Sequence, residues 1–179
     1  EQEHNKAYQH VRLMEYLNEL PIIQIILDYV EADDIIAYLN GHNKYRDYHK
    51  YIISSDRDFF QLVGDRTSLY RPIQKKLVTK DGLLTEHGIH PNNFALARAM
   101  AGDKSDNLDG IAGVGLGTIA KRFTFMAEDR ECYLDELLSF CEEQRKENNL
   151  KVYTRIIEGE SIIRQNYKIM QLYSPSISI

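Results

Sequence analysis

The first half of the chain alternates between apolar residues at helical spacing and short continuous apolar runs. In residues 5–19, Val11 and Met14 belong to a series that recurs every three or four positions, which predicts an amphipathic helix. The apolar run at 22–29 predicts a buried strand. The same reasoning predicts a helix at 33–39, a polar loop at 41–50, a strand at 51–55, a short helix at 59–63 and a strand pair at 68–79. This order of elements is typical of an α/β sheet with parallel strands.

The second half is predicted to be helical throughout. Its apolar spacing indicates helices at 92–101, 117–127, 133–146 and 152–165, and leaves the tail at 172–179 unassigned. We therefore predict two domains, an α/β domain at 1–90 and an all-helical domain at 91–179, with the change of pattern falling within 80–91.

The bulk composition describes a globular chain of 179 residues with 43% hydrophobic residues and a net charge of −5. No stretch approaches the roughly 20 apolar residues of a membrane span, and the polar start lacks a signal-peptide core. Cys132 and Cys141 are too few for a disulfide scaffold and fit a reduced, cytoplasmic protein. Because the first residue is not Met, we expect a fragment or a trimmed chain.

Acidic residues gather in three short clusters, and each cluster alone has an ordinary structural explanation. Helix N-termini favour acids because of the helix dipole, and aspartates commonly cap turns. Taken together, the clusters offer only oxygen ligands, as hard cations such as magnesium or manganese prefer. The first two follow predicted strands, where α/β sheets place their sites. The clusters are Glu31, Asp33 and Asp34; Asp56 and Asp58; and Asp103 and Asp106.

A ladder of glycines follows the third cluster, within residues 108–123. Gly110, Gly113, Gly115 and Gly117 permit tight turns and close backbone approach. The spacing matches neither a dinucleotide-binding fingerprint nor a phosphate loop. Two interpretations stay open at this point. The segment is either a structural connection between helices or a hairpin that grips a DNA backbone without reading its sequence.

Three motifs in this order, EADD, SSDRDFFQL and AGDKSDNLDGIAGVGLGTIAKRF, resemble the flap endonuclease/5′–3′ exonuclease family. The family includes bacteriophage 5′-nucleases and the amino-terminal nuclease domain of bacterial DNA polymerase I. The resemblance covers about residues 31–123. It implies an α/β, PIN-like nuclease core with a parallel sheet, present in part. An all-helical subdomain with a helix–three-turn–helix DNA clamp would follow this core.

The resemblance also implies a site. The resemblance implies that Glu31 and Asp33 bind the first of two Mg²⁺ (or Mn²⁺) ions. Asp56, Asp58 and Asp103 would bind the second ion. Asp106 would lie close by, and Asp34 would support the site. The catalytic residues would be these acids without Asp34. The implied DNA-binding residues are Gly113, Gly115, Gly117, Thr118, Lys121 and Arg122, and a K⁺ ion is expected on the main chain of Gly110, Ile111 and Val114.

The expected function is a structure-specific 5′-nuclease that hydrolyses phosphodiester bonds in branched or 5′-ended DNA, and in RNA primers during DNA replication, by a two-metal mechanism. The alternative is a non-catalytic DNA-binding module that retains the clamp. A small α/β phosphatase leaves the glycine ladder unexplained. In the family, a strand with a metal-binding aspartate and a basic arch would precede Glu1. We therefore expect a monomer when intact, and DNA binding with weak cleavage by this polypeptide alone.

Overall fold

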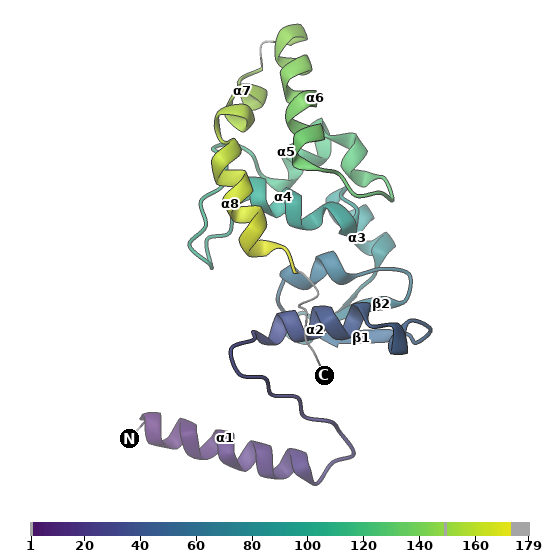
Figure 1. The fold of residues 1–179 in the computed structure, drawn as a ribbon, viewed down its shortest axis with the longest axis vertical. Helices are drawn as coiled ribbons and strands as arrows, with labels where there is room; N and C mark the ends of the chain where they lie inside the picture. The colour runs from purple at the N-terminus through teal and green to yellow at the C-terminus, as the bar shows by residue number, and fades with distance from the viewer. Residues whose placement is uncertain (1, 149, 173–179) are drawn as a thin grey trace. The chain divides into compact units, whose positions relative to one another are not determined.

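The computed structural model describes residues 2–148 and 150–172 of the chain (Figure 1). Its contacts divide the chain into two compact units, Glu1–Glu31 and Ala32–Ile179. The boundary expected from the sequence, between residues 90 and 91, stays a prediction. Within the described residues, no helix has the length and apolar character needed to cross a membrane.

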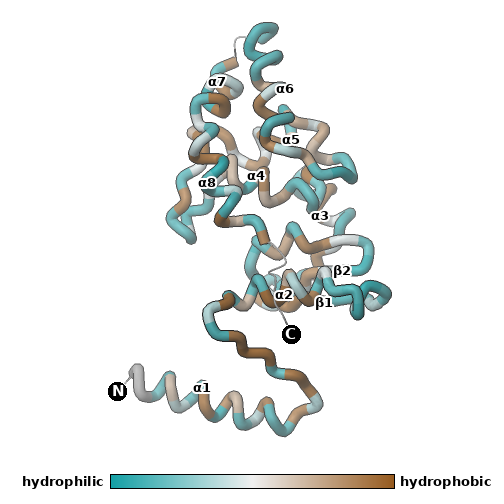
Figure 2. The backbone as a smooth tube through the Cα atoms, viewed as in Figure 1, coloured by the Kyte–Doolittle hydropathy of each residue, from teal (hydrophilic) through white to brown (hydrophobic). Residues whose placement is uncertain are grey.

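The first unit consists of helix α1 (Gln2–Asn18) and an irregular segment that continues to Glu31. The helix confirms the prediction for residues 5–19, but the strand predicted at 22–29 is wrong. Figure 2 shows that this segment is strongly hydrophobic, yet Ile23 is 86% exposed. A strand requires hydrogen bonds to a neighbouring strand. Among the described residues, none pairs with this segment, and Tyr29 interrupts the extended backbone with a φ of +62°.

The second unit contains a three-stranded sheet of order β1-β2-β3. Its strands are β1 (Lys50–Ile53), β2 (Thr67–Arg71) and β3 (Lys76–Val78). Strands β1 and β2 are parallel, and the strand pair predicted at 68–79 is confirmed as β2 and β3, which run antiparallel. The register aligns Ile52 with Leu69 and Leu69 with Val78. All three side chains are buried, because alternate residues of a strand face the same side of the sheet.

Helices make up most of the second unit (Figure 1). The α-helices are α2 (Ala32–Gly41), α3 (Lys80–His87), α4 (Phe94–Ala101), α5 (Leu116–Arg122), α6 (Leu134–Glu147), α7 (Lys151–Glu158) and α8 (Glu160–Met170), and the 3-10 helices are η1 (Asn43–Tyr45), η2 (Asp58–Leu62), η3 (Pro91–Asn93) and η4 (Thr124–Ala127). Helix α4 packs against α8 and against η2, and α6 packs against α7. Helix α4 therefore connects the helical part to the turn that follows β1.

The observed helices differ from the predicted ones at two places. Helix α3 was not predicted, although Thr79 caps its start by accepting a hydrogen bond from the Gly82 N–H and Gly88 ends it with a φ of +65°. The single helix predicted at 152–165 is two helices separated at Gly159. A Cβ atom at Gly159 would lie 2.1 Å from Cδ1 of Ile111, so the break allows the chain to pack closely there. The unassigned tail lies outside the described residues from 173 onward.

Candidate metal and nucleic-acid site

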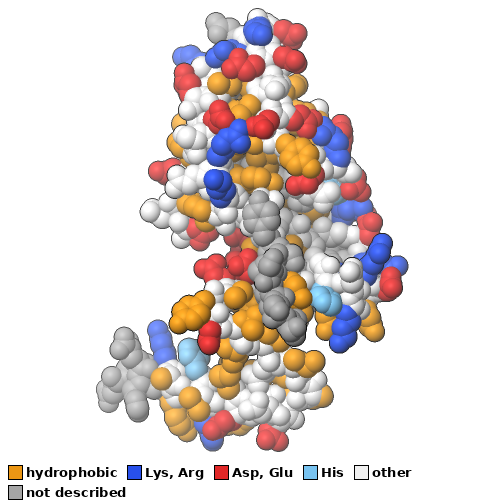
Figure 3. All heavy atoms as spheres, in the orientation of Figure 1, with side chains coloured by type: hydrophobic (Ala, Val, Ile, Leu, Met, Phe, Trp, Pro, Cys, Tyr) orange, Lys and Arg blue, Asp and Glu red, His pale blue; other side chains and the backbone are white. Residues whose placement is uncertain are grey.

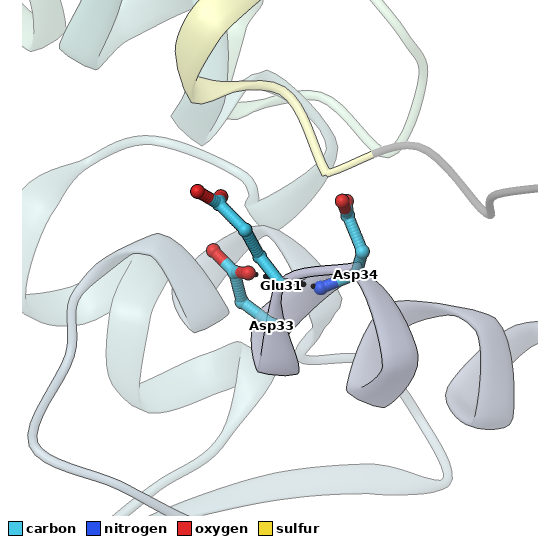
Figure 4. Close-up of side chains that lie close together, drawn as sticks. All are labelled: Glu31, Asp33 and Asp34. Atoms are coloured by element: carbon cyan, nitrogen blue, oxygen red, sulfur yellow. Dashed lines mark hydrogen bonds between the residues drawn. The ribbon is translucent and has the colours of Figure 1, made fainter. Parts of the chain in front are cut away.

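The first acidic cluster lies at the start of α2. Glu31, Asp33 and Asp34 each offer a carboxylate oxygen, and these oxygens lie within 4.8 Å of one another. Figure 4 shows the three side chains together at the beginning of the helix. Asp33 also accepts a hydrogen bond from the Asp34 N–H at 3.0 Å. The cluster was expected to follow a strand, which is wrong. The first turn of α2 positions Asp33 and Asp34, where the helix dipole favours negative charge.

The second cluster follows β1, near the carboxyl end of a strand that pairs in parallel. Oδ1 of Asp56 accepts a hydrogen bond from the Asp58 N–H at 2.9 Å, and the Asp56 N–H donates to Oγ of Ser54 at 3.1 Å. Asp56 and Asp58 do not share one side of an extended backbone, because the chain turns here and Asp58 begins η2. Asp56 therefore has the turn-capping role that was the ordinary alternative, and Asp58 is carried inward.

The third cluster lies in a tight loop. The backbones of Asp103 and Leu108 exchange two hydrogen bonds of 2.8 Å, which close the loop. Oδ1 of Asp103 accepts hydrogen bonds from the N–H of Ser105 at 2.8 Å and from its Oγ–H at 2.5 Å. Asp106 is exposed on the same loop. The loop thus fixes the Asp103 carboxylate and leaves that of Asp106 accessible.

A buried arginine joins the second cluster to the third. Arg98 projects from α4, and its side chain is only 8% exposed. Its Nη1 lies 2.5 Å from Oδ1 of Asp58, and its Nη2 donates a hydrogen bond to Oδ2 of Asp103. The Asp58 contact lacks hydrogen-bond geometry, so this buried oxygen has a charged partner but no hydrogen-bond donor among the described residues.

Arg98 is a site residue that the sequence reasoning missed. A signal for it exists, because it is the single charged residue in the otherwise apolar helix sequence FALARAMA. Charged side chains are rarely buried unless they are paired. An arginine at that position therefore predicts a buried ion pair with nearby acids.

Acids of all three clusters contribute to a raised pKa at Asp58. Burial raises the pKa of Asp58 above its ordinary value, and the negative charges of Asp56, Asp106 and Asp33 raise it further, while Arg98 opposes them. A cavity of about 430 Å³ lies beside this group and is lined by Ser55, Asp56, Arg57, Arg98, Asp103, Ser105 and Asp106. Like charges are thus held close together, an arrangement that a bound cation would stabilise.

The clusters do not form one compact ligand cage. Within the part of the chain that the structure describes, Glu31, Asp33 and Asp34 are the one group of three acids, histidines or cysteines whose ligand atoms all lie within 4.8 Å. Asp58 and Asp103 instead share the Arg98 guanidinium. Glu31 is the last residue of the first unit, so its place is described only with its chain neighbours. The donor set is entirely carboxylate oxygen and so fits a hard divalent cation.

The glycine ladder forms a closely packed turn between the acidic loop and α5. A Cβ atom on Gly102 would lie 2.3 Å from the backbone nitrogen of Gly110, and a Cβ atom on Gly110 would lie 2.5 Å from the backbone nitrogen of Gly102. The two backbones therefore cross at a distance that only glycine permits. Gly113 has a φ of +78°. Gly113, Gly115 and Gly117 are all exposed.

Residues 3–88 match the family described as 5′–3′ exonuclease, N-terminal resolvase-like domain. A thermostable DNA polymerase I of Thermus thermophilus is 38% identical over 91 residues, which cover 51% of this chain and 11% of the polymerase. A 5′–3′ exonuclease of Buchnera aphidicola is 30% identical over 124 residues, 67% of this chain and 43% of the exonuclease. The chain thus spans less than half the length of these relatives.

Two solved structures of a bacteriophage T5 protein have a similar fold. One was co-crystallised with metal ions and has a TM-score of 0.75 at 18% identity, covering 94% of this chain and 61% of that chain. The other is described as a flap endonuclease complex with DNA and metal ions. Its TM-score is 0.72 at 18% identity, with 92% and 58% of the two chains covered. At this identity the likeness shows that the fold is shared.

Proposed function

Because the chain belongs to the flap endonuclease/5′–3′ exonuclease family, we propose that it is part of a structure-specific 5′-nuclease that depends on divalent metal ions. Its substrates are branched or 5′-ended DNA and RNA primers paired with DNA, in the cytoplasm of a bacterial or phage-infected cell. The observation that supports this function best is the cavity lined by Asp56, Asp103 and Asp106, beside the half-buried carboxylate of Asp58.

In this proposal the acids divide between two metal positions. Glu31 and Asp33, with support from Asp34, hold the first ion, and Asp56, Asp58 and Asp103 hold the second, with Asp106 nearby. The ions are Mg²⁺ or Mn²⁺, and when bound they supply an activated water and stabilise the leaving oxygen of the phosphodiester. The orphaned Oδ1 of Asp58 is a suitable ligand atom, since it is buried and lacks a hydrogen-bond donor.

The residues of the chain itself have two tasks. Ser105 and Arg98 orient the carboxylate of Asp103 through the hydrogen bonds described above. Arg98 also neutralises part of the acidic charge, which keeps the acids close together when no metal is bound. Holding charged ligands in place before the substrate arrives is how active sites reduce the reorganisation needed during reaction.

The turn formed by the glycine ladder, residues 108–118, is the proposed contact with duplex DNA, and we call it the glycine turn. The amides of Gly113, Gly115, Gly117 and Thr118 would donate to phosphate oxygens, and Lys121 and Arg122 would supply positive charge. Contacts of this kind position a protein on DNA without reading its sequence. We also propose a K⁺ ion on the main-chain oxygens of Gly110, Ile111 and Val114, and a monomeric protein.

The function is tested by measuring metal binding and cleavage separately. Mn²⁺ titration followed by electron paramagnetic resonance should show binding to the wild-type chain and weaker binding to the Asp58→Asn and Asp106→Asn variants. A labelled 5′-flap substrate should be cut only when Mg²⁺ or Mn²⁺ is present. Because the chain spans under half of its relatives, the same assay should include a longer polypeptide if its gene encodes one. Absence of Mn²⁺ binding by the wild type would contradict the proposal.

One observation favours the alternative function of a DNA-binding module without catalysis. Arg98 already pairs with both Asp58 and Asp103, and in a non-catalytic protein it would occupy the place of a cation permanently. That protein would bind flap DNA equally well with and without divalent metal and would not cut it in any polypeptide length.

A further inference from the structure

The glycine turn carries no positive charge of its own. Residues 108–118 include one acid, Asp109, and neither lysine nor arginine. Lys121 and Arg122, the next cations along the chain after the turn, lie in the last turn of α5. A surface that holds phosphate groups usually combines amide donors with a cation. The turn therefore depends on other elements for charge at its exposed side.

Helix α7 brings an arginine onto this turn. Nη1 of Arg155 donates a hydrogen bond to the carbonyl oxygen of Ala112 at 3.0 Å. The same nitrogen lies 3.0 Å from the position that a Cβ atom on Gly113 would occupy. The guanidinium thus rests directly on an exposed glycine of the turn. Both Arg155 and Gly113 are exposed, so this contact does not close off the guanidinium.

Arg155 forms no ion pair with an acid among the described residues, unlike three arginines of the same helical part. Arg130, Arg145 and Arg164 each form ion pairs with glutamates or aspartates, and Figure 3 shows basic and acidic side chains intermixed over α6, α7 and α8. Within the described residues, the Ala112 carbonyl is the one hydrogen-bond partner of the Arg155 side chain, and no carboxylate lies within 4.0 Å. A guanidinium has five N–H donors, so most of them remain available.

The position of Arg155 is set by close packing of α7 and α8 against the turn. Gly159, between these helices, approaches Ile111 so closely that a Cβ would lie 2.1 Å from its Cδ1. Buried Asn166 of α8 donates hydrogen bonds to the carbonyls of Ala99 at 3.0 Å and Asp109 at 2.8 Å. These contacts hold the turn against α8 and against Gly159 at the end of α7. A charge held in place in this way loses little conformational freedom when it binds a ligand.

We propose that Arg155 is a phosphate-binding residue that extends the duplex-binding surface from the glycine turn to α7. It would use the donors not engaged by Ala112 to contact a backbone phosphate of double-stranded DNA, next to the phosphate held by the Gly113 and Gly115 amides. This inference rests on the proposed function, because it takes the glycine turn to be a DNA contact. An arginine suits the task since its planar fork can bind phosphate through two N–H groups.

Three substitutions distinguish a phosphate contact from a purely structural contact with the turn. Arg155→Gln keeps a donor for the Ala112 carbonyl but removes the charge, Arg155→Lys keeps the charge, and Arg155→Ala removes both. Arg145→Ala is a matched control, since Arg145 is an exposed arginine that pairs with Glu142 on α6. Thermal melts of all four should resemble that of the wild type, because both arginines are on the surface.

The measurement is binding of a short, fluorescently labelled blunt duplex in EDTA, repeated from about 50 to 200 mM salt. Arg155→Gln and Arg155→Ala should each weaken binding about tenfold. They should also reduce the slope of log affinity against log salt by about one unit. Arg155→Lys should keep the slope and Arg145→Ala should keep both quantities. Wild-type affinity and slope in Arg155→Gln would overturn the inference and leave Arg155 a structural residue.

Lys121→Ala, measured alongside, separates this inference from the function on which it rests. If Lys121→Ala weakens binding and Arg155→Gln does not, the glycine turn contacts DNA without help from α7, and only the present inference fails. If the wild type does not bind duplex DNA, the proposed function of the turn fails and the role of Arg155 fails with it.

Discussion

The guanidinium of Arg98 lies 2.5 Å from the carboxylate of Asp58. The two residues are 40 positions apart in the sequence, one in α4 and the other at the start of η2. Arg98 also pairs with Asp103, so one buried cation is shared by two acids that we propose as metal ligands. The pairing couples the packing of α4 to the electrostatics of the proposed site.

Arg98→Ala should destabilise the protein. Removing one partner of a buried ion pair leaves uncompensated charge and typically costs about 3 kcal/mol or more. We expect a reduction of that order in the free energy of unfolding, measured by urea denaturation in EDTA. The control Arg145→Ala should cost less than about 1 kcal/mol, because its pair is exposed.

Added Mg²⁺ should raise the melting temperature of Arg98→Ala more than that of the wild type, because the cation would take over the neutralisation of Asp58 and Asp103. An equal or smaller rise would argue against metal binding by these two acids.

Asp58→Asn should stabilise the protein at neutral pH when no metal is present. Burial and neighbouring acids raise the pKa of Asp58 above its ordinary value of 3.8. The folded state therefore binds the proton more tightly than the unfolded state. The free energy of unfolding contributed by this group is lost as the pH rises from about 3.8 through the folded pKa.

The Asp58→Asn variant should thus be more stable than the wild type at pH 7 by roughly 1 kcal/mol, and the difference should vanish below about pH 4. Excess Mg²⁺ should reverse the order, since the amide is a weaker ligand. A variant less stable than the wild type at pH 7 in EDTA would contradict the electrostatic account.

His90 should make the stability of the protein depend on pH in the opposite sense. Its side chain is only 3% exposed, and burial lowers its pKa below 6.5, against the opposing effect of Asp129. On acidification the unfolded chain takes up the proton first. The free energy of unfolding should therefore be constant with respect to this group above about pH 6.5, and should fall as the pH drops from there toward the folded pKa.

His90→Asn is a conservative test, because Asn can also accept the hydrogen bond that Nδ1 of His90 receives from the Asn92 N–H. Urea midpoints at about pH 7.5 and 5.5 should differ less in this variant than in the wild type. Burial lowers the pKa of His87 as well, so His87→Asn should be measured in parallel. If the free energy of unfolding of His90→Asn depends on pH as in the wild type, His90 is not the source of the pH dependence.

Two glycines of the ladder should respond differently to substitution. A Cβ at Gly110 would lie 2.1 Å from the Ala101 carbonyl oxygen, whereas nothing lies within 4 Å of a Cβ at Gly115. Gly110→Ala should therefore destabilise the protein by at least about 2 kcal/mol. Gly115→Val should leave the melting temperature nearly unchanged but weaken duplex binding, because its side chain would hold the phosphate away from the proposed amide donors.

For each variant, circular dichroism melts measure the stability and duplex titrations measure the affinity for DNA. Normal DNA binding by a folded Gly115→Val protein would remove that amide from the proposed interface, and normal stability of Gly110→Ala would show that the loop can relax.

Short-range patterns predicted much of the local structure. The helix beginning near Asp33, the strand pair at 68–79 and the helix α6 follow from apolar spacing and turn residues within a few positions of one another. The same patterns failed at 22–29. An apolar run is compatible with a strand but becomes one only when a neighbouring strand supplies hydrogen bonds, and the described residues provide none there.

The sequence by itself determined the chemistry that the chain can offer: carboxylates in three clusters, a ladder of glycines, and cations near the glycine turn. Only the tertiary structure decided which of these groups meet. The fold places Arg98 between Asp58 and Asp103. It also brings Arg155 into contact with Gly113, which is 42 positions away in the chain. Such pairings depend on how α4, α7 and α8 pack. Packing is set by the fit of many side chains at once, so it leaves no periodic signal around any one residue.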